Sequence, residues 1–136
     1  MKMSIILPAV LLVVLCTSRA DAQALYRCSA KQVMNFEDDG TLGQPKKDFF
    51  LNWWTNVLID TASGVVRRPN SPQPLERWTV LQRGNDEYDF VATDQPQRDQ
   101  APNDLLRVRN WRTSPQPMFI MMGLSFVVTG TCAAVK

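Results

Sequence analysis

The sequence contains no histidine, and only three cysteines and six glycines among 136 residues. Without histidine there is no Ser-His or Cys-His couple, no conventional zinc site and no side chain that ordinarily titrates near neutral pH. The few glycines form neither a phosphate-binding loop nor a calcium-binding loop. We therefore expect a protein that is not an enzyme and that carries no metal ion or other cofactor.

Residues 1–22 have the pattern of a cleaved bacterial export signal. A single basic residue near the start is followed by an apolar stretch, and Ala20-Asp21-Ala22 has the small-x-small pattern of a signal peptidase site. The apolar stretch is too short to span a bilayer comfortably, so no membrane span is expected after cleavage. A lipoprotein signal processed at Cys16 stays open as an alternative. The pattern predicts a periplasmic or secreted protein.

Cleavage after residue 22 would leave residues 23–136, which suffice for one domain with a single core. It would remove two of the 15 basic and one of the 13 acidic residues, so that the net charge falls from +2 to +1. Arg107 and Arg109 share a strand face, but a nearly neutral chain is a poor polyanion binder, and no nucleic-acid partner is expected. We expect a monomer.

Two cysteines remain in the mature chain, Cys28 near its start and Cys132 near its end. Disulfides form in the compartments to which an export signal leads. A metal or redox pair is a poor alternative because the spacing is wrong and histidine is absent. The sequence therefore predicts a structural disulfide that joins the two ends of the domain.

Between the cysteines, short segments of alternating apolar and polar residues are separated by turn residues, which is typical of an all-β protein. Every proline of the mature chain falls in a segment interpreted as a loop. Seven to eight antiparallel strands are expected, arranged as a small closed barrel, with a sandwich as the alternative. The expected strands are residues 24–30, 33–36, 49–59, 75–83, 87–92, 105–111 and 118–129, with a short run at 65–66.

Residues 49–59, FFLNWWTNVLI, are the densest apolar run outside the leader. Alternation at period two gives a strand with one apolar face, whereas the same residues also match the i, i+3, i+4 spacing of an amphipathic helix. The run is rich in aromatic and β-branched residues, and no strong helix former such as alanine or glutamate supports the helix. Composition thus favours the strand, and the helix stays open as the alternative.

The run ends in Asp60-Thr61-Ala62-Ser63-Gly64, which we interpret as the turn of a hairpin. Residues 57–62 are similar to the hydrophobic-Asp-Thr-Gly signature of aspartic proteases, but Ala62 stands where that loop requires glycine. Asp60 is therefore interpreted as a turn residue that hydrogen-bonds its own backbone, and Ser63 as a turn hydroxyl.

Three short matches carry a family resemblance: Tyr26-x-Cys28, Ser63-Gly64 followed by a basic residue, and the closing Cys132. In these points the chain resembles the membrane-bound inhibitors of c-type lysozyme, which are small exported bacterial β-barrels. The resemblance implies that Ser63 lies in a loop presented to the cleft of a lysozyme-like hydrolase. It also implies that Arg67 or Arg68 faces the acidic residues of that enzyme. The chain lacks the Tyr and the Trp-x-x-Gly that usually follow Ser-Gly.

The sequence thus predicts an exported binding protein that acts through a loop surface, possible candidates being Asp60, Ser63, Gly64, Arg67 and Arg68. A carrier of a small ligand or glycan, with Trp53 and Trp54 lining the barrel mouth, is one alternative. An envelope structural protein is the other. A deep apolar cavity would favour the carrier, whereas a filled interior with a protruding turn would favour the inhibitor.

Overall fold

The computed structural model describes residues 25–85, 87–94, 104–110 and 116–136, so the proposed leader lies outside the described residues. Within these ranges no helix is long and apolar enough to cross a membrane. The elements in chain order are β1 (Leu25–Phe36), β2 (Leu42–Gly43), α1 (Phe49–Trp53), β3 (Val57–Asp60), β4 (Val65–Arg67), β5 (Pro74–Arg77), β6 (Thr79–Gln82), β7 (Phe90–Thr93), β8 (Leu105–Arg109), β9 (Met118–Met122) and β10 (Phe126–Ala134).

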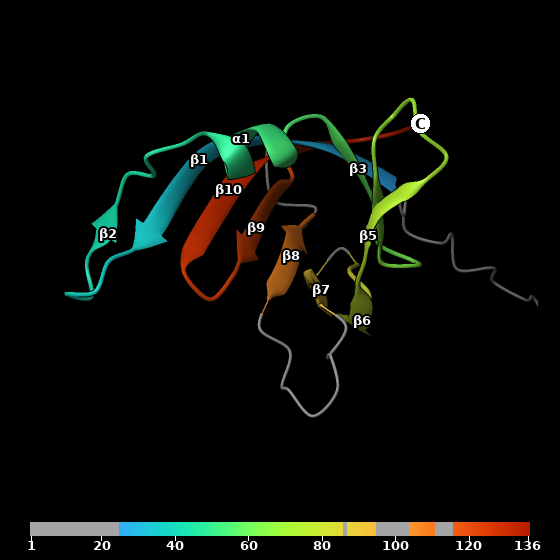
Figure 1. The fold of residues 1–136 in the computed structure, drawn as a ribbon. Coiled ribbons are helices and arrows are strands. Elements are labelled where there is room, and N and C mark those ends of the chain that lie inside the picture. The colour runs from blue at the N-terminus through green and yellow to red at the C-terminus, as the bar shows by residue number, and fades with distance from the viewer. Residues whose placement is uncertain (1–24, 86, 95–103, 111–115) are drawn as a thin grey trace, which may run out of the picture.

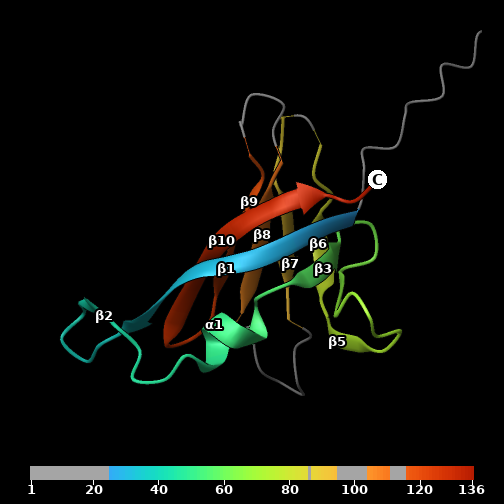
Figure 2. The ribbon, with the colours of Figure 1, turned by 90° about the horizontal axis from the view of Figure 1, so that it is seen from above.

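The strands form one antiparallel sheet that curves into a nearly closed barrel (Figure 1). Their order around the barrel is β5-β4-β3-β1-β10-β9-β8-β7-β6, and the short β2 pairs only with the far end of β1. β1 and β10 lie side by side as the two longest strands (Figure 2). The predicted all-β barrel is confirmed, and the described residues form ten strands in place of the seven or eight expected.

The barrel is closed by the chain itself at Trp78. β5 and β6 are the two ends of the strand order, and Trp78 is the only residue between them. Before it, Arg77 pairs with Val65 of β4, and after it, Thr79 pairs with Thr93 of β7. The segment predicted as one strand, residues 75–83, is therefore two strands joined at a corner.

β1 unites two segments that the sequence analysis had separated, residues 24–30 and 33–36. It is a twelve-residue strand whose pairing with β10 shifts between Ala30 and Gln32. Beside this β-bulge the backbone N–H of Ala30 donates to the carbonyl oxygen of Trp54 at 3.0 Å. A bulge bends a strand and increases its twist, which lets β1 follow the curve of the barrel.

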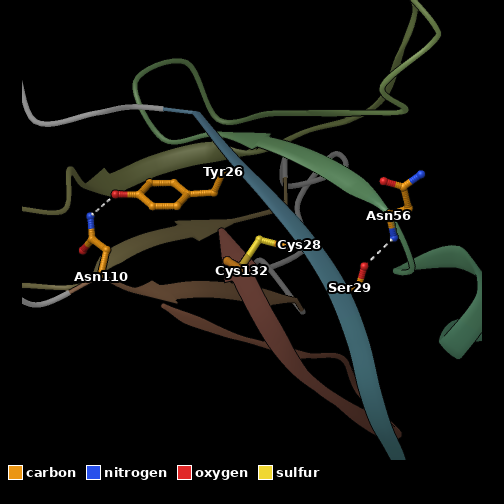
Figure 3. The surroundings of a disulfide bond; sticks show 6 residues. All are labelled: Tyr26, Cys28, Ser29, Asn56, Asn110 and Cys132. Atoms are coloured by element: carbon orange, nitrogen blue, oxygen red, sulfur yellow. Dashed lines mark hydrogen bonds between the residues drawn. A yellow bond between two sulfur atoms is a disulfide. The ribbon is translucent and has the colours of Figure 1, made fainter. Parts of the chain in front are cut away.

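The predicted disulfide is confirmed. Cys28 of β1 and Cys132 of β10 are directly opposite each other in the ladder, and their sulfur atoms are 2.02 Å apart. Both side chains are buried in the barrel. Close by, the ring of Tyr26 extends from β1 across the interior, and its hydroxyl accepts a hydrogen bond from Asn110 Nδ2 at 2.8 Å (Figure 3). The disulfide thus ties β1 to its neighbour β10, and the hydrogen bond ties β1 to the residue that follows β8.

Side chains fill the interior of the barrel. The largest fully buried ones are aromatic: Trp54, Phe90 and Phe119. Trp54 lies against Phe119 with ring centroids 5.8 Å apart, and against Trp78 at 6.1 Å. Each buried aromatic side chain removes a large apolar area from water, so this cluster dominates the stability of the core.

The strand predicted for residues 49–59 is wrong over its first half, where the helical alternative holds. Residues 49–53 form α1, and the strand begins only at Val57. The helix is fixed by tertiary contact: Phe50 stacks on Phe126 of β10 with ring centroids 3.7 Å apart. It ends before Asn56, whose φ of 54° is left-handed and turns the chain into β3.

Two further expectations need correction. Residues 118–129 are two strands, β9 and β10, because Gly123 N–H donates to Phe126 O at 2.9 Å and turns the chain back. Pro74 is the first residue of β5 and not part of a loop, a position where its missing N–H costs no ladder bond. β6 and β7 pair as a hairpin around Gly84, between the segments predicted as strands 75–83 and 87–92.

Candidate functional site

The Asp60–Gly64 turn joins β3 to β4 and satisfies its own polar groups. Asp60 Oδ1 accepts the backbone N–H of Ala62 at 2.9 Å and that of Ser63 at 3.3 Å. Ser63 Oγ donates to Asp60 Oδ2 at 2.7 Å. Asp60 is therefore the turn residue that the sequence predicted, and the turn presents Ala62 and Ser63 to solvent in one preorganised shape.

Gly64 fixes this turn against the barrel corner. Its φ of +73° is left-handed, and an added Cβ would collide with the carbonyl oxygen of Trp78. In return, Gly64 O accepts the backbone N–H of Trp78 at 2.9 Å. The turn is thus held by the same residue that closes the barrel, which limits its freedom to move.

Of the two candidate arginines, only Arg67 lies on the outer face beside the turn. Arg67 pairs with Leu58 of β3. Val65 lies two residues before Arg67, so both side chains point to the same side of the sheet, and Val65 pairs with Asp60, the first residue of the turn. Arg68 is used within the fold, because its Nη1 donates to Thr55 O at 2.6 Å. This bond holds the segment between α1 and β3.

Two arginines that the sequence analysis did not select join Arg67 on this face. Arg27 of β1 pairs with Leu58, as Arg67 does from the other side, and Arg77 of β5 pairs with Val65. Directly paired residues of an antiparallel sheet point to the same side. Three arginines from three strands therefore surround Leu58 and Val65 next to the turn; we call Arg27, Arg67, Arg77 and the Asp60–Gly64 turn the arginine surface.

The two candidate aromatic residues lie in different environments. Trp54 is buried in the core and lines no open mouth. Its indole N–H has no hydrogen-bond partner in the described part of the chain. Trp53 is half-buried on α1, and its Nε1 donates to Glu76 Oε1 at 3.0 Å. Phe49, an exposed residue, stacks on Trp53 with ring centroids 5.8 Å apart.

Glu76 is a half-buried carboxylate that the sequence analysis missed. It pairs with the inward-facing Val66, and it accepts a second indole hydrogen bond from Trp78 Nε1 at 2.9 Å. Burial raises the pKa of Glu76, while the hydrogen bonds from Trp53 and Trp78 oppose this rise. Residues two apart on a strand point to the same side, so a buried Trp78 would have predicted that Glu76 also points inward.

Asp104 lies near Glu76 at the same end of the barrel. Burial first, and then the charge of Asp94, raise the pKa of Asp104, and the Asp104 charge in turn raises the pKa of Glu76. Asp104 N–H donates to Asp94 Oδ1 at 3.1 Å, which fixes the two acids together. Among the described residues, no group of three acidic or cysteine side chains has the geometry to hold a metal ion.

Comparisons with known proteins give no assignment: no family model, no curated protein and no solved structure matches this chain.

Proposed function

We propose that this chain is an exported, non-enzymatic binding protein that acts through the arginine surface. Its target on this proposal is an acidic cleft, such as that of a lysozyme-like cell-wall hydrolase. The observation that carries the proposal is the combination of a self-contained exposed turn with three outward arginines beside it. A rigid turn loses little conformational entropy on binding, and clustered arginines favour an acidic partner.

The filled interior supports surface binding over enclosure of a ligand. Trp54, Phe90 and Phe119 occupy the space in which a carrier would hold its cargo. A small ligand or glycan carrier would have to use the exposed stack of Phe49 on Trp53 outside the barrel. That stack is the one observation that favours this second candidate, because sugar rings pack well on exposed aromatic faces.

The experiment measures binding of the mature chain to a c-type lysozyme, together with the rate at which the enzyme lyses cell walls. Ser63→Trp places a bulky side chain on the exposed turn, and we expect it to abolish both binding and inhibition. Ser125→Trp is the matched control, since Ser125 is also an exposed turn residue but lies between β9 and β10. It should leave both readings unchanged.

A charge variant tests the role of the arginines separately. Arg67→Glu should weaken binding and reduce its dependence on salt, because the positive field at the turn is lost. Failure of the wild-type chain to bind lysozyme, or equal losses in the Ser63 and Ser125 variants, would refute the proposal. Binding of oligosaccharides that Phe49→Ala abolishes would establish the second candidate instead.

A further inference from the structure

Part of the outer face of the sheet formed by β1, β10, β9 and β8 is apolar. Strand pairing aligns Met34, Val127, Met122 and Leu105 in one row across these four strands. Directly paired residues point to the same side, and the neighbours Leu106, Met121 and Val128 are the ones buried inside. The row therefore points outward.

The apolar row continues along the strands in both directions at period two. On one side lie Ile120 and Met118 of β9, and on the other Phe36 of β1, which pairs with Leu42 of β2. Four of these side chains are at least two-fifths exposed: Phe36 (42%), Leu42 (53%), Met118 (40%) and Met122 (42%). We call this set the methionine face; its members are Met34, Phe36, Leu42, Leu105, Met118, Ile120, Met122 and Val127.

Contiguous exposed apolar side chains of this kind mark an interaction surface, since singly scattered ones are what a monomer normally shows. Methionine is frequent on such surfaces because its unbranched side chain adapts to a partner.

The two ends of the methionine face carry opposite charge. At one end Arg107 pairs with Ile120, and Arg109 with Met118. Both arginines contact the buried Asp89, and these three described side chains together carry a formal charge of +1. A small hollow of about 10 Å³ lies between them and the β9 side chains.

At the other end, Phe36 leads directly into the exposed turn Glu37-Asp38-Asp39-Gly40. Asp39 Oδ1 accepts hydrogen bonds from the backbone N–H and the hydroxyl of Thr41, and these lower the pKa of Asp39. The three acids give this end a charge of −3.

This distribution is self-complementary about the middle of the face. Arg107 lies in the same row as Gln32, whereas the acidic turn begins five residues further along β1. The point halfway between the charged ends falls at the Val127–Met122 pair of β10 and β9. A two-fold axis that lies in the contact plane, passes through that pair and runs at right angles to the line joining the charged ends would place the basic end of one molecule over the acidic end of another. β1 and β8 are three strand spacings apart, so each lies about 7 Å from the midpoint, measured across the strands.

We propose that the methionine face binds a second copy of this chain in a two-fold symmetric dimer. The apolar side chains of the two copies pack around Val127 and Met122, and Arg107 and Arg109 of each copy face the Glu37–Asp39 turn of the other. An isologous interface requires one patch to complement itself, and a face that is apolar in the middle and oppositely charged at its ends meets that requirement. The inference is independent of the arginine surface, which lies around β3 and β4.

Sedimentation equilibrium of the mature chain, from low to several hundred micromolar, tests the dimer. Twice the monomer mass should develop with concentration. Met122→Glu buries a charge at the axis and should weaken association at least about tenfold. Leu81→Glu is the matched control, because Leu81 is an exposed leucine of β6 outside the methionine face and its variant should associate like wild type.

A charge-swap experiment tests the orientation of the two copies. In the proposed dimer position 38 of each copy faces position 109 of the other. Asp38→Lys makes both of these side chains cationic in its own dimer and Arg109→Glu makes both anionic, so each variant alone should associate more weakly than wild type. In the mixed dimer positions 38 and 109 carry opposite charges at both contacts, and native mass spectrometry should find mainly the heterodimer. If Arg109→Glu does not fold, Met122→Cys serves instead, since its thiol lies beside the axis and should cross-link two copies faster than that of Leu81→Cys.

A chain that stays monomeric at every concentration would overturn the proposal. So would a dimer that survives Met122→Glu, or one that Leu81→Glu weakens equally, because either result would place the contact on another surface. An absence of preference for the heterodimer would overturn the two-fold arrangement.

Discussion

Replacing both Cys28 and Cys132 by alanine should remove a large part of the stability of this domain. The bond closes a loop between residues that are 104 positions apart. In the chain-entropy model, a loop of about 100 residues stabilises the folded state by about 4.7 kcal/mol, since it restricts the unfolded chain. Domains of this size have a total stability of roughly 5–15 kcal/mol. The variant should therefore unfold roughly 20 °C lower.

Urea denaturation followed by circular dichroism measures this loss, with the oxidised wild type and the double variant compared at the same pH. The reduced wild type is a second comparison, and it should match the variant to within the small packing cost of the two lost sulfur atoms. A loss below about 1 kcal/mol would refute the loop-closure reasoning. Free thiols in the purified, oxidised wild type would refute the bond itself.

Two further predictions concern Glu76 and Gly64. Because the pKa of Glu76 is raised in the folded state, its stabilising contribution is present at acidic pH and is lost as the pH rises through that folded pKa. In urea titrations Glu76→Gln should therefore gain stability relative to wild type as the pH rises above 4.5, the ordinary pKa of glutamate, and a stability difference that does not change with pH would contradict this. Gly64→Ala should destabilise by more than about 2 kcal/mol, because it adds a collision with the Trp78 carbonyl to the strain of a left-handed φ. Gly40→Ala is the control, with a similar φ of +83° but open space, and should cost only about 1 kcal/mol; equal losses in thermal unfolding would show that the collision is relieved.

The features that were predictable from the sequence depend on local or covalent chemistry. Asp60 and Ser63 form the expected turn because a short polar side chain reaches the backbone two or three residues further on. Cys28 and Cys132 were paired correctly because only these two cysteines lie in the segment predicted to form the domain, residues 23–136, and two cysteines allow only one bond. Neither inference requires knowledge of distant contacts.

The strand was preferred to the helix over residues 49–53 because this sequence satisfies two periods at once. Aromatic pairs at Phe49, Phe50, Trp53 and Trp54 match both the alternation of a strand and the turn of a helix. The contact that decides between them is the stack of Phe50 on Phe126, 76 positions further along the chain. A preference set by a distant contact overrides intrinsic propensity, and no local pattern reveals it.

The candidate surface was predictable only in part, and for a related reason. Arg67 was found because it follows the turn in the sequence. Arg27 and Arg77 come from other strands and join it only through the pairing of β1 with β3 and of β4 with β5. A net charge near neutral conceals such clusters, because it sums the arginines here with the acids of the Glu37–Asp39 turn at the other end of β1.

The corner at Trp78 indicates where local unfolding of the barrel begins. β1 and β10 are joined by nine residue pairs and a disulfide. β5 and β6, at the two ends of the strand order, share no ladder and are joined only through Trp78. Local opening should therefore start at the β5–β6 junction, so the backbone amides of β5 and β6 should exchange hydrogen with solvent much faster than those of β1. Because Gly64 O accepts the backbone N–H of Trp78, the Asp60–Gly64 turn would lose its fixed shape whenever the β5–β6 junction opens.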